Sequence, residues 1–75
     1  MKHNKMIGMA NQIAIYFHSY PDDRAVAGVA THIKKFWSPL MRERLLAEIE
    51  ASSEGVDRLV LAAIEKDRKQ VDRAA

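Results

Sequence analysis

The sequence contains no cysteine, and this absence excludes several kinds of site at once. Disulfide bonds, thiolate zinc sites and cysteine-ligated iron–sulfur clusters all require that residue. The three histidines, His3, His18 and His32, do not recur at the i, i+3 or i, i+4 spacing that places two ligands on one helical face. We therefore expect no metal site on this chain.

An excess of charge of one sign is also missing, because 12 basic and 10 acidic residues alternate along the chain and give a formal charge of +2. A nucleic-acid binder concentrates its basic residues in a stripe. The uncharged stretch from Met6 to Pro21 is short and contains polar side chains such as Asn11 and Gln12, which do not suit a membrane span. We therefore expect a soluble, cytoplasmic protein that binds neither nucleic acid nor membrane.

The 75 residues are enough for one small domain. A domain of this size buries only about 60% of the surface that its unfolded chain exposes, so it is marginally stable. Without a disulfide bond or a metal, association with a partner is the remaining source of stability. We expect a single helical domain over 1–75, with frayed ends at about 1–3 and 70–75.

Apolar residues recur at steps of three and four throughout the sequence, a period typical of α-helices. Turn residues divide this pattern into four helices of a small, compact all-α bundle, at roughly 4–20, 21–36, 39–51 and 58–70. Pro21 and Pro39 each fit the first turn of a helix, and Ser38 and Asp57 are expected to cap the helices that follow them. Gly55 is expected to adopt a left-handed conformation in the turn after the third helix.

Each predicted helix carries most of its apolar residues on one side, which we expect to form the core. In the first helix these residues are Met6, Met9, Ala10, Ile13, Tyr16, Phe17 and Tyr20. In the second they are Val26, Val29, Ala30, Ile33 and Phe36, with Trp37 at the end. In the last two they are Met41, Leu45, Leu46 and Ile49, then Val60, Ala63, Ile64 and Val71.

Three residues of the first helix, Asn11, Ile15 and His18, share the side opposite its apolar face. One interpretation is a solvated polar strip with a single exposed isoleucine, since scattered exposed apolar residues are normal. The other is a partner contact, in which Ile15 fills a pocket and the two polar side chains form hydrogen bonds around it.

Small residues, Ala27, Gly28 and Thr31, gather on the side of the second helix away from Val29. Glycine inside a helix costs up to about 1 kcal/mol relative to alanine, so close approach of a neighbour is expected to offset that cost. The neighbour is either the fourth helix or a foreign subunit. Trp37 also has two interpretations, as a core residue or as an anchor in an interface.

The residue patterns of common catalytic sites are absent from the sequence. No serine stands in a nucleophile elbow, and no glycine-rich loop follows a strand. Asp22 and Asp23 resemble a carboxylate pair but fit the solvated start of a helix, where negative charge is favourable. A chain this short also has little interior for a water-excluding pocket. We therefore do not expect an enzyme.

Several runs of the sequence resemble the delta subunit family of NAD-dependent formate dehydrogenases. They are residues 9–14 (MANQIA), 25–30 (AVAGVA), 32–39 (HIKKFWSP), 41–42 (MR) and 55–60 (GVDRLV). The resemblance covers about residues 6–65, and the stretch from AVAG to FW-x-P is its most specific part. Thr31 and Ser38 stand where aspartate is common in that family, Leu40 where a basic residue is common, and Arg58 where proline often opens the last helix.

The resemblance implies a non-catalytic accessory subunit of a soluble, oxygen-tolerant formate dehydrogenase. In such complexes the larger subunits hold a molybdenum or tungsten pterin, iron–sulfur clusters, FMN and the NAD site, and the delta chain holds no cofactor. The delta chain is associated with assembly or stability of the complex through contact with the large catalytic subunit. The candidate contact residues on this chain are Asn11, Ile15, His18, Ala27, Gly28, Thr31 and Trp37.

Two alternatives belong to other classes of protein. A helix-turn-helix DNA-binding module is possible in outline, because two helices meet at Ser38 and Pro39. Its recognition helix would carry Glu43, Glu48 and Glu50, however, and these carboxylates would be repelled by phosphates. The other alternative is a self-associating helical module, and a homodimer is possible for the isolated chain in either case.

Overall fold

Four α-helices follow one another in the computed structural model, which describes the backbone of residues 5–74 and the side chains of residues 5–68. The helices are α1 (Lys5–Phe17), α2 (Asp22–Phe36), α3 (Pro39–Ala51) and α4 (Arg58–Ala74). No strand occurs within the described backbone. The prediction of a four-helix, all-α fold is therefore confirmed.

Two helix ends differ from the sequence-based prediction. The first helix ends at Phe17 rather than at Tyr20, and the N–H of Tyr20 donates to the carbonyl of Phe17 at 3.0 Å in a turn. Pro21 explains the early end, because the residue before a proline is disfavoured in helical conformation. The last helix continues to Ala74 rather than ending near residue 70, since residues 69–74 contain neither glycine nor proline. The predicted frayed end at 1–3 lies outside the described residues.

The predicted caps are present at the expected residues. The hydroxyl of Ser38 accepts a hydrogen bond from the N–H of Met41 at 3.2 Å, and Pro39 occupies the first turn of α3. Asp57 Oδ1 accepts from the N–H of Leu59 at 2.9 Å at the start of α4. Gly55 has a φ of +81°, in the left-handed region that favours glycine. These three predictions are confirmed.

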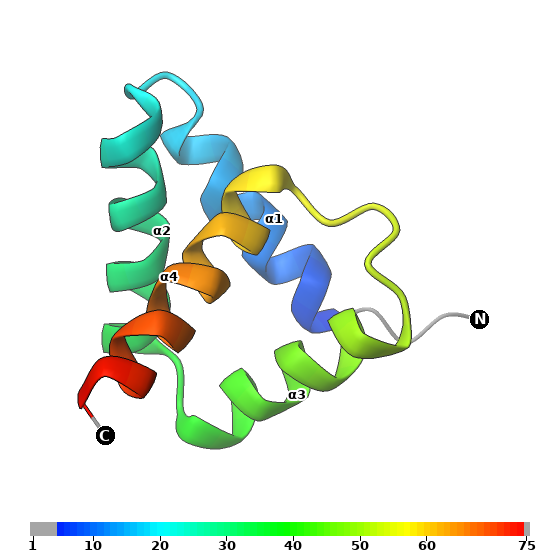
Figure 1. Ribbon diagram of the computed structural model, residues 1–75. Coiled ribbons are helices and arrows are strands. Elements are labelled where there is room, and N and C mark those ends of the chain that lie inside the picture. Colours follow the sequence, from blue (N-terminus) through cyan, green and yellow to red (C-terminus); the bar gives the residue numbers. More distant parts are fainter. Residues whose placement is uncertain (1–4, 75) are drawn as a thin grey trace.

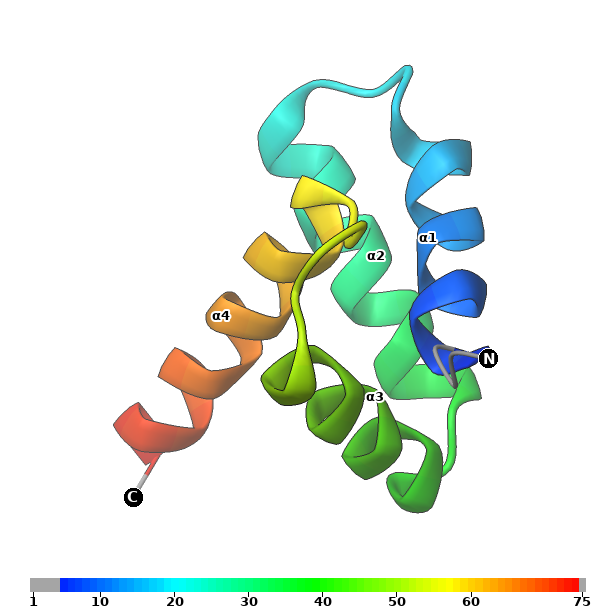
Figure 2. The same cartoon turned by 90° about the vertical axis from the view of Figure 1, so that its right-hand side faces the viewer.

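The helices pack around α1 and α2, which form an antiparallel hairpin (Figures 1 and 2). The strongest helix–helix packing is between α2 and α4, and α1 contacts each of the other three helices. The third helix packs against α1, whereas α3 and α4 diverge and touch each other little (Figure 2). The sides of α3 and α4 that face each other are therefore not packed closely together.

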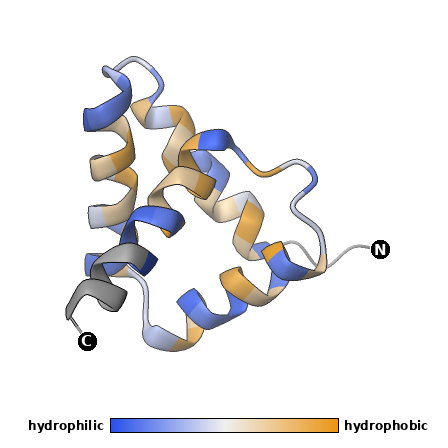
Figure 3. Ribbon diagram, in the orientation of Figure 1, coloured by the Kyte–Doolittle hydropathy of each residue, from blue (hydrophilic) through white to orange (hydrophobic). Residues whose placement is uncertain are grey.

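The core consists of residues from all four helices and from the turn after α2. Apolar residues lie along the facing sides of α1, α2 and α4, while the first turn of α2 is hydrophilic (Figure 3). The buried residues are Met6, Ile7, Ala10, Ala14, Ala25, Val29, Ile33, Trp37, Leu45, Leu59, Val60 and Ala63. No polar or charged side chain is buried among the described residues.

Five predicted core residues are largely or partly exposed: Met9, Tyr16, Tyr20, Phe36 and Leu46. The predicted apolar face of α1 was therefore too broad. Three helices contact α1, and together they bury the stripe through Ile7, Ala10 and Ala14 instead. Phe36 lies in the last turn of α2 and is 71% exposed. The side chain of Val71, another predicted core residue, lies outside the described side chains.

The carboxylate of Glu48 in α3 caps the beginning of α1. Glu48 Oε1 accepts from the N–H of Ile7 at 3.0 Å, and Oε2 accepts from the N–H of Met6 at 3.3 Å. The first turn of a helix has N–H groups without partners and a partial positive charge, so a carboxylate is well suited to it. This contact fixes the position of α3 on α1.

Candidate protein-binding site

An apolar groove of about 250 Å³ is lined by residues of α2, α3 and α4. Its lining includes Ala30 and Ile33 from α2, Leu45 and Leu46 from α3, and Ala63 and Ile64 from α4. Leu46 is 38% exposed there, because α3 turns its buried side toward α1 and leaves this residue without a helix to cover it. The groove thus presents carbon surface to solvent.

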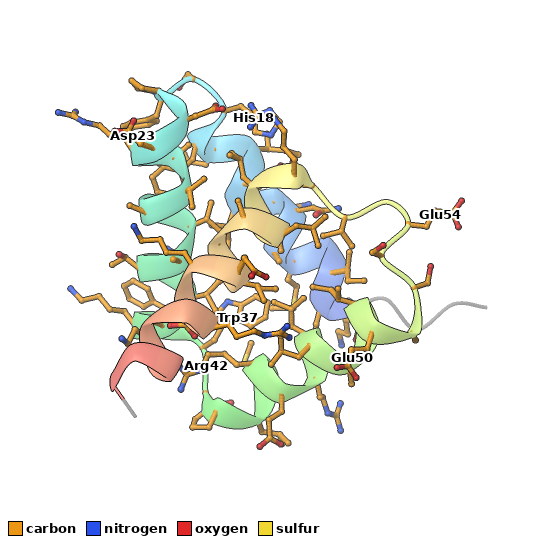
Figure 4. The ribbon with its side chains drawn as sticks, viewed as in Figure 1. His18, Asp23, Trp37, Arg42, Glu50 and Glu54 are labelled. Carbon is orange, nitrogen blue, oxygen red and sulfur yellow. The ribbon has the colours of Figure 1, made fainter. Side chains whose placement is uncertain are left out.

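Four charged residues complete the lining: Lys34, Arg42, Asp67 and Arg68. Two ion pairs occur among the described side chains, His18 with Asp57 and Arg58 with Asp22, and neither includes these cations. The groove therefore carries three cations and one carboxylate. Figure 4 shows Arg42 on the side of α3 that is closer to α4.

The polar groups of the groove lie at its border, on long side chains such as Lys34 and Arg42. Its volume is near the lower end of the range of about 300–1,000 Å³ that is usual for small-molecule pockets. Within residues 5–68, no cluster of three or more histidines, cysteines or carboxylates is placed to hold a metal ion.

The predicted strip of Asn11, Ile15 and His18 does occupy one side of α1, but its polar members bind the loop between α3 and α4. The Asn11 amide donates to the carbonyl of Gly55 at 2.8 Å and accepts from the N–H of Asp57 at 2.9 Å. His18 Nε2 donates to Asp57 Oδ2 at 2.7 Å. Neither interpretation made from the sequence included this contact with the protein's own loop, and a partner contact through these residues stays a prediction.

Ile15 lies between these two residues along α1 and is 64% exposed. The sequence-based proposal that it enters a partner's pocket stays a prediction.

A second surface ion pair joins Arg58 and Asp22, where Arg58 donates to both carboxylate oxygens of Asp22 at 3.0 and 3.2 Å. The hydrogen bond to this carboxylate raises the pKa of Arg58. The pair joins the beginning of α4 to the beginning of α2 but is solvent-exposed, so it contributes little stability.

The ring of Phe17 from α1 packs against Gly28. A Cβ at position 28 would lie 2.7 Å from Phe17 Cδ1, which is closer than real Cβ atoms approach. Neither neighbour considered from the sequence, the fourth helix or a foreign subunit, is the nearest one in the structure, and contact of a foreign subunit at this position stays a prediction. Ala27 is half-buried and Thr31 is exposed, so only Gly28 of this group has its role explained.

Trp37 is a core residue, with 7% of its surface exposed. Its side chain is directed into the molecule in Figure 4, and its small exposed part lies in a shallow depression between α1 and α2. This depression also includes Met9, Ile13 and His32. The prediction that Trp37 packs in the core is confirmed. The side chain does not project from the bundle, and a part in binding a partner stays a prediction.

The residues that make the groove a candidate site were not singled out from the sequence. Leu46 was expected in the core. Lys34 and Arg42 appeared only within the runs that carry the family resemblance. A signal did exist in α3, where Arg42, Leu46 and Ile49 follow one another at steps of four and three. That spacing predicts a shared side but not that the side stays uncovered.

The fold and the groove define a small helical protein that presents an apolar surface bordered by cations. The model of the NADH-dependent formate dehydrogenase delta subunit family, FdsD, matches residues 5–64. The chain therefore belongs to this family, and the resemblance seen in the sequence is confirmed. No curated protein and no solved structure is similar enough to match it. No helix in the described part of the chain is long and apolar enough to cross a membrane.

Proposed function

We propose that this chain is a non-catalytic accessory subunit that supports assembly or stability of an NADH-dependent formate dehydrogenase by contacting its large catalytic subunit. The observation that carries the proposal is membership of the delta subunit family over residues 5–64. On this proposal the redox cofactors, a molybdenum or tungsten pterin, iron–sulfur clusters and FMN, belong to the other subunits together with the NAD site.

The surface of the chain supports a role in binding another protein. Eight large apolar side chains are substantially exposed: Met9, Ile15, Tyr16, Tyr20, Phe36, Leu40, Leu46 and Leu61. Single exposed apolar residues are common, but contiguous apolar surface bordered by polar residues marks interaction sites. The groove around Leu46 has this composition. A partner would also add to the limited core of so short a chain.

The proposal is tested by producing the remaining subunits of the complex with and without this chain. Two quantities are measured separately: the amount of assembled complex, and the rate of formate-dependent NAD reduction per assembled complex. We expect omission of the chain to lower the amount of active complex several-fold and to leave the rate per complex nearly unchanged. Size-exclusion chromatography with metal analysis gives the amount of assembled, cofactor-loaded enzyme.

The opposite result would be a normal amount of complex with a greatly reduced rate per complex. That outcome would connect the chain to the chemical step and contradict an accessory role. Adding the purified chain back to complex made without it separates a lasting structural role from a role during assembly. Recovery of activity on addition would indicate a permanent subunit.

A further inference from the structure

The groove between α3 and α4 lacks a cover because of how the fold is held together. The carboxylate of Glu48 binds α3 to the beginning of α1, while α4 packs mainly against α2. The sides of α3 and α4 that face each other therefore have no helix between them. Leu46 and Ile64 lie on these sides, and both contribute to the lining of the groove.

The charges around the groove indicate the chemistry of what covers it. Lys34, Arg42 and Arg68 contribute three positive charges and Asp67 one negative charge, and none of these cations has an ion-pair partner within the described side chains. An apolar occupant with carboxylates at its edges would bury carbon surface and place negative charge beside the cations. A basic occupant would meet like charge, which disfavours binding.

The shape of the groove indicates a polypeptide segment. Two diverging helices with an apolar floor resemble the grooves that receive the apolar face of an amphipathic helix. The volume of about 250 Å³ can receive a few large apolar side chains.

The other exposed apolar residues give a weaker indication of a partner. Tyr16 and Tyr20 pack against Phe17 and against each other, with ring centroids 4.9 to 6.2 Å apart. Phe36 packs against the ring of His32 at 4.8 Å. These aromatic side chains therefore already have aromatic neighbours within the chain.

We infer that the groove lined by Leu46, Ile64 and Ala63 binds an apolar, carboxylate-bearing segment of the large catalytic subunit, with Lys34 and Arg42 facing the carboxylates. This inference rests on the proposed function, since it specifies the surface by which the accessory subunit contacts its partner. Apolar burial supplies most of the affinity, and the cations select the segment and its orientation.

The test measures binding of the purified chain to the large subunit isolated from complex made without the chain. The groove variant is Lys34→Glu with Arg42→Glu. Its matched control is Lys35→Glu with Arg44→Glu, which changes the charge equally on the same two helices at exposed residues outside the groove lining. We expect the groove variant to weaken binding by at least about tenfold and the control by no more than about threefold. Circular dichroism verifies that both variants are folded.

A second pair of variants tests the apolar floor. Leu46→Asp places a carboxylate in the groove, and Leu40→Asp does the same at an exposed position of α3 outside it. We expect only Leu46→Asp to weaken binding. Hydrogen exchange of the wild-type chain needs no substitution, and complex formation is expected to slow exchange in segments 30–34, 42–46 and 63–68 more than in segment 15–20.

The outcomes separate the two proposals. If the wild-type chain does not bind the large subunit at all, the proposed contact with that subunit is wrong. If it binds, but the groove variants bind as tightly as their controls and exchange is unchanged in the groove segments, the proposed function stands and the groove is not the contact surface. If sedimentation shows that the isolated chain is a dimer and Leu46→Asp dissociates it without weakening binding to the large subunit, the groove joins two copies and the inference is overturned.

Discussion

The ring of Phe17 lies over Gly28 and fills the space that a side chain at position 28 would need. A Cβ there would stand 2.7 Å from Phe17 Cδ1 and from Cζ. The last residue of α1 is therefore packed onto the middle of α2 because position 28 has no side chain. Glycine inside a helix is unfavourable by itself, so this contact offsets a local cost of up to about 1 kcal/mol.

The Phe17 contact predicts that the effect of Gly28→Ala changes sign with the residue at position 17. In the wild-type chain the added methyl must displace the ring, and we expect the free energy of unfolding to fall by about 1 kcal/mol. In a Phe17→Ala background the ring is gone, and Gly28→Ala should raise the free energy of unfolding by about 0.5–1 kcal/mol because alanine has the better helix propensity. Urea denaturation of the four proteins measures the coupling. Equal destabilisation in both backgrounds would show that something other than the ring opposes a side chain at position 28.

The cap that Glu48 places on α1 predicts a local electrostatic contribution to stability. Glu48→Ala leaves the N–H groups of Met6 and Ile7 without this acceptor, and we expect it to lower the free energy of unfolding by about 1–2 kcal/mol. Glu48→Gln retains an acceptor oxygen but loses the charge facing the helix end, so its effect should be smaller. Glu50→Ala is the control, and as an exposed residue on the same helix it should change stability by less than about 0.5 kcal/mol. Similar effects of Glu48→Ala and Glu50→Ala would mean that the cap contributes nothing measurable.

The two hydrogen bonds of Asn11 predict that one side chain holds the α3–α4 loop in place. Asn11→Ala removes both bonds, and we expect it to destabilise the protein by about 1–3 kcal/mol and to speed hydrogen exchange at the N–H of Asp57. Asn11→Asp should also destabilise, because a carboxylate meets the Gly55 carbonyl where the amide donated. Gln12→Ala changes the exposed neighbour and serves as the control. Unaltered exchange at Asp57 in Asn11→Ala would contradict the assignment.

The adjacent residues Phe36 and Trp37 predict opposite sensitivities to truncation. Trp37 is 7% exposed and Phe36 is 71% exposed. Trp37→Ala removes a large core side chain and should cost about 3–5 kcal/mol, which is much of the stability of a chain this short. Phe36→Ala should cost less than about 0.5 kcal/mol. Thermal unfolding followed by circular dichroism compares them, and a Trp37→Ala protein as stable as the wild type would exclude a core role.

Features fixed by neighbours in the sequence were predicted correctly from the residues. Ser38 and Asp57 cap helices through bonds to N–H groups two or three residues away, and Gly55 adopts its left-handed conformation within one turn. The boundaries of α2 and α3 follow from prolines and caps for the same reason. These interactions are local, so the amino-acid order contains them directly.

Phe36 shows where helical periodicity stops being informative. Ala25, Val29, Ile33 and Trp37 recur at steps of four and are all buried, although the backbone becomes extended at Trp37 with φ −98° and ψ 140°. The spacing of Phe36 from Ile33 placed it on the apolar side as well, but it is 71% exposed in the last turn of α2.

The candidate site was not predictable because it depends on contacts between distant parts of the chain. The spacing of Asn11 and His18 correctly predicted that their side chains lie on the same side of the molecule. It did not predict the loop that they bind, because the position of that loop depends on how α3 and α4 pack. The groove around Leu46 likewise depends on the packing of α3 against α1, which Glu48 helps to fix. Nothing within α3 itself distinguishes Leu46 from a core leucine.

The hydrogen bonds that α1 forms with Glu48, Gly55 and Asp57 span 41 to 46 residues of sequence. During synthesis α1 is made first, but it cannot form these hydrogen bonds until Glu48, Gly55 and Asp57 have been added to the chain. At about 5–20 residues per second, α1 waits a few seconds for the loop to emerge. The dependence on distant partners also implies that the native chain unfolds as one cooperative unit rather than helix by helix.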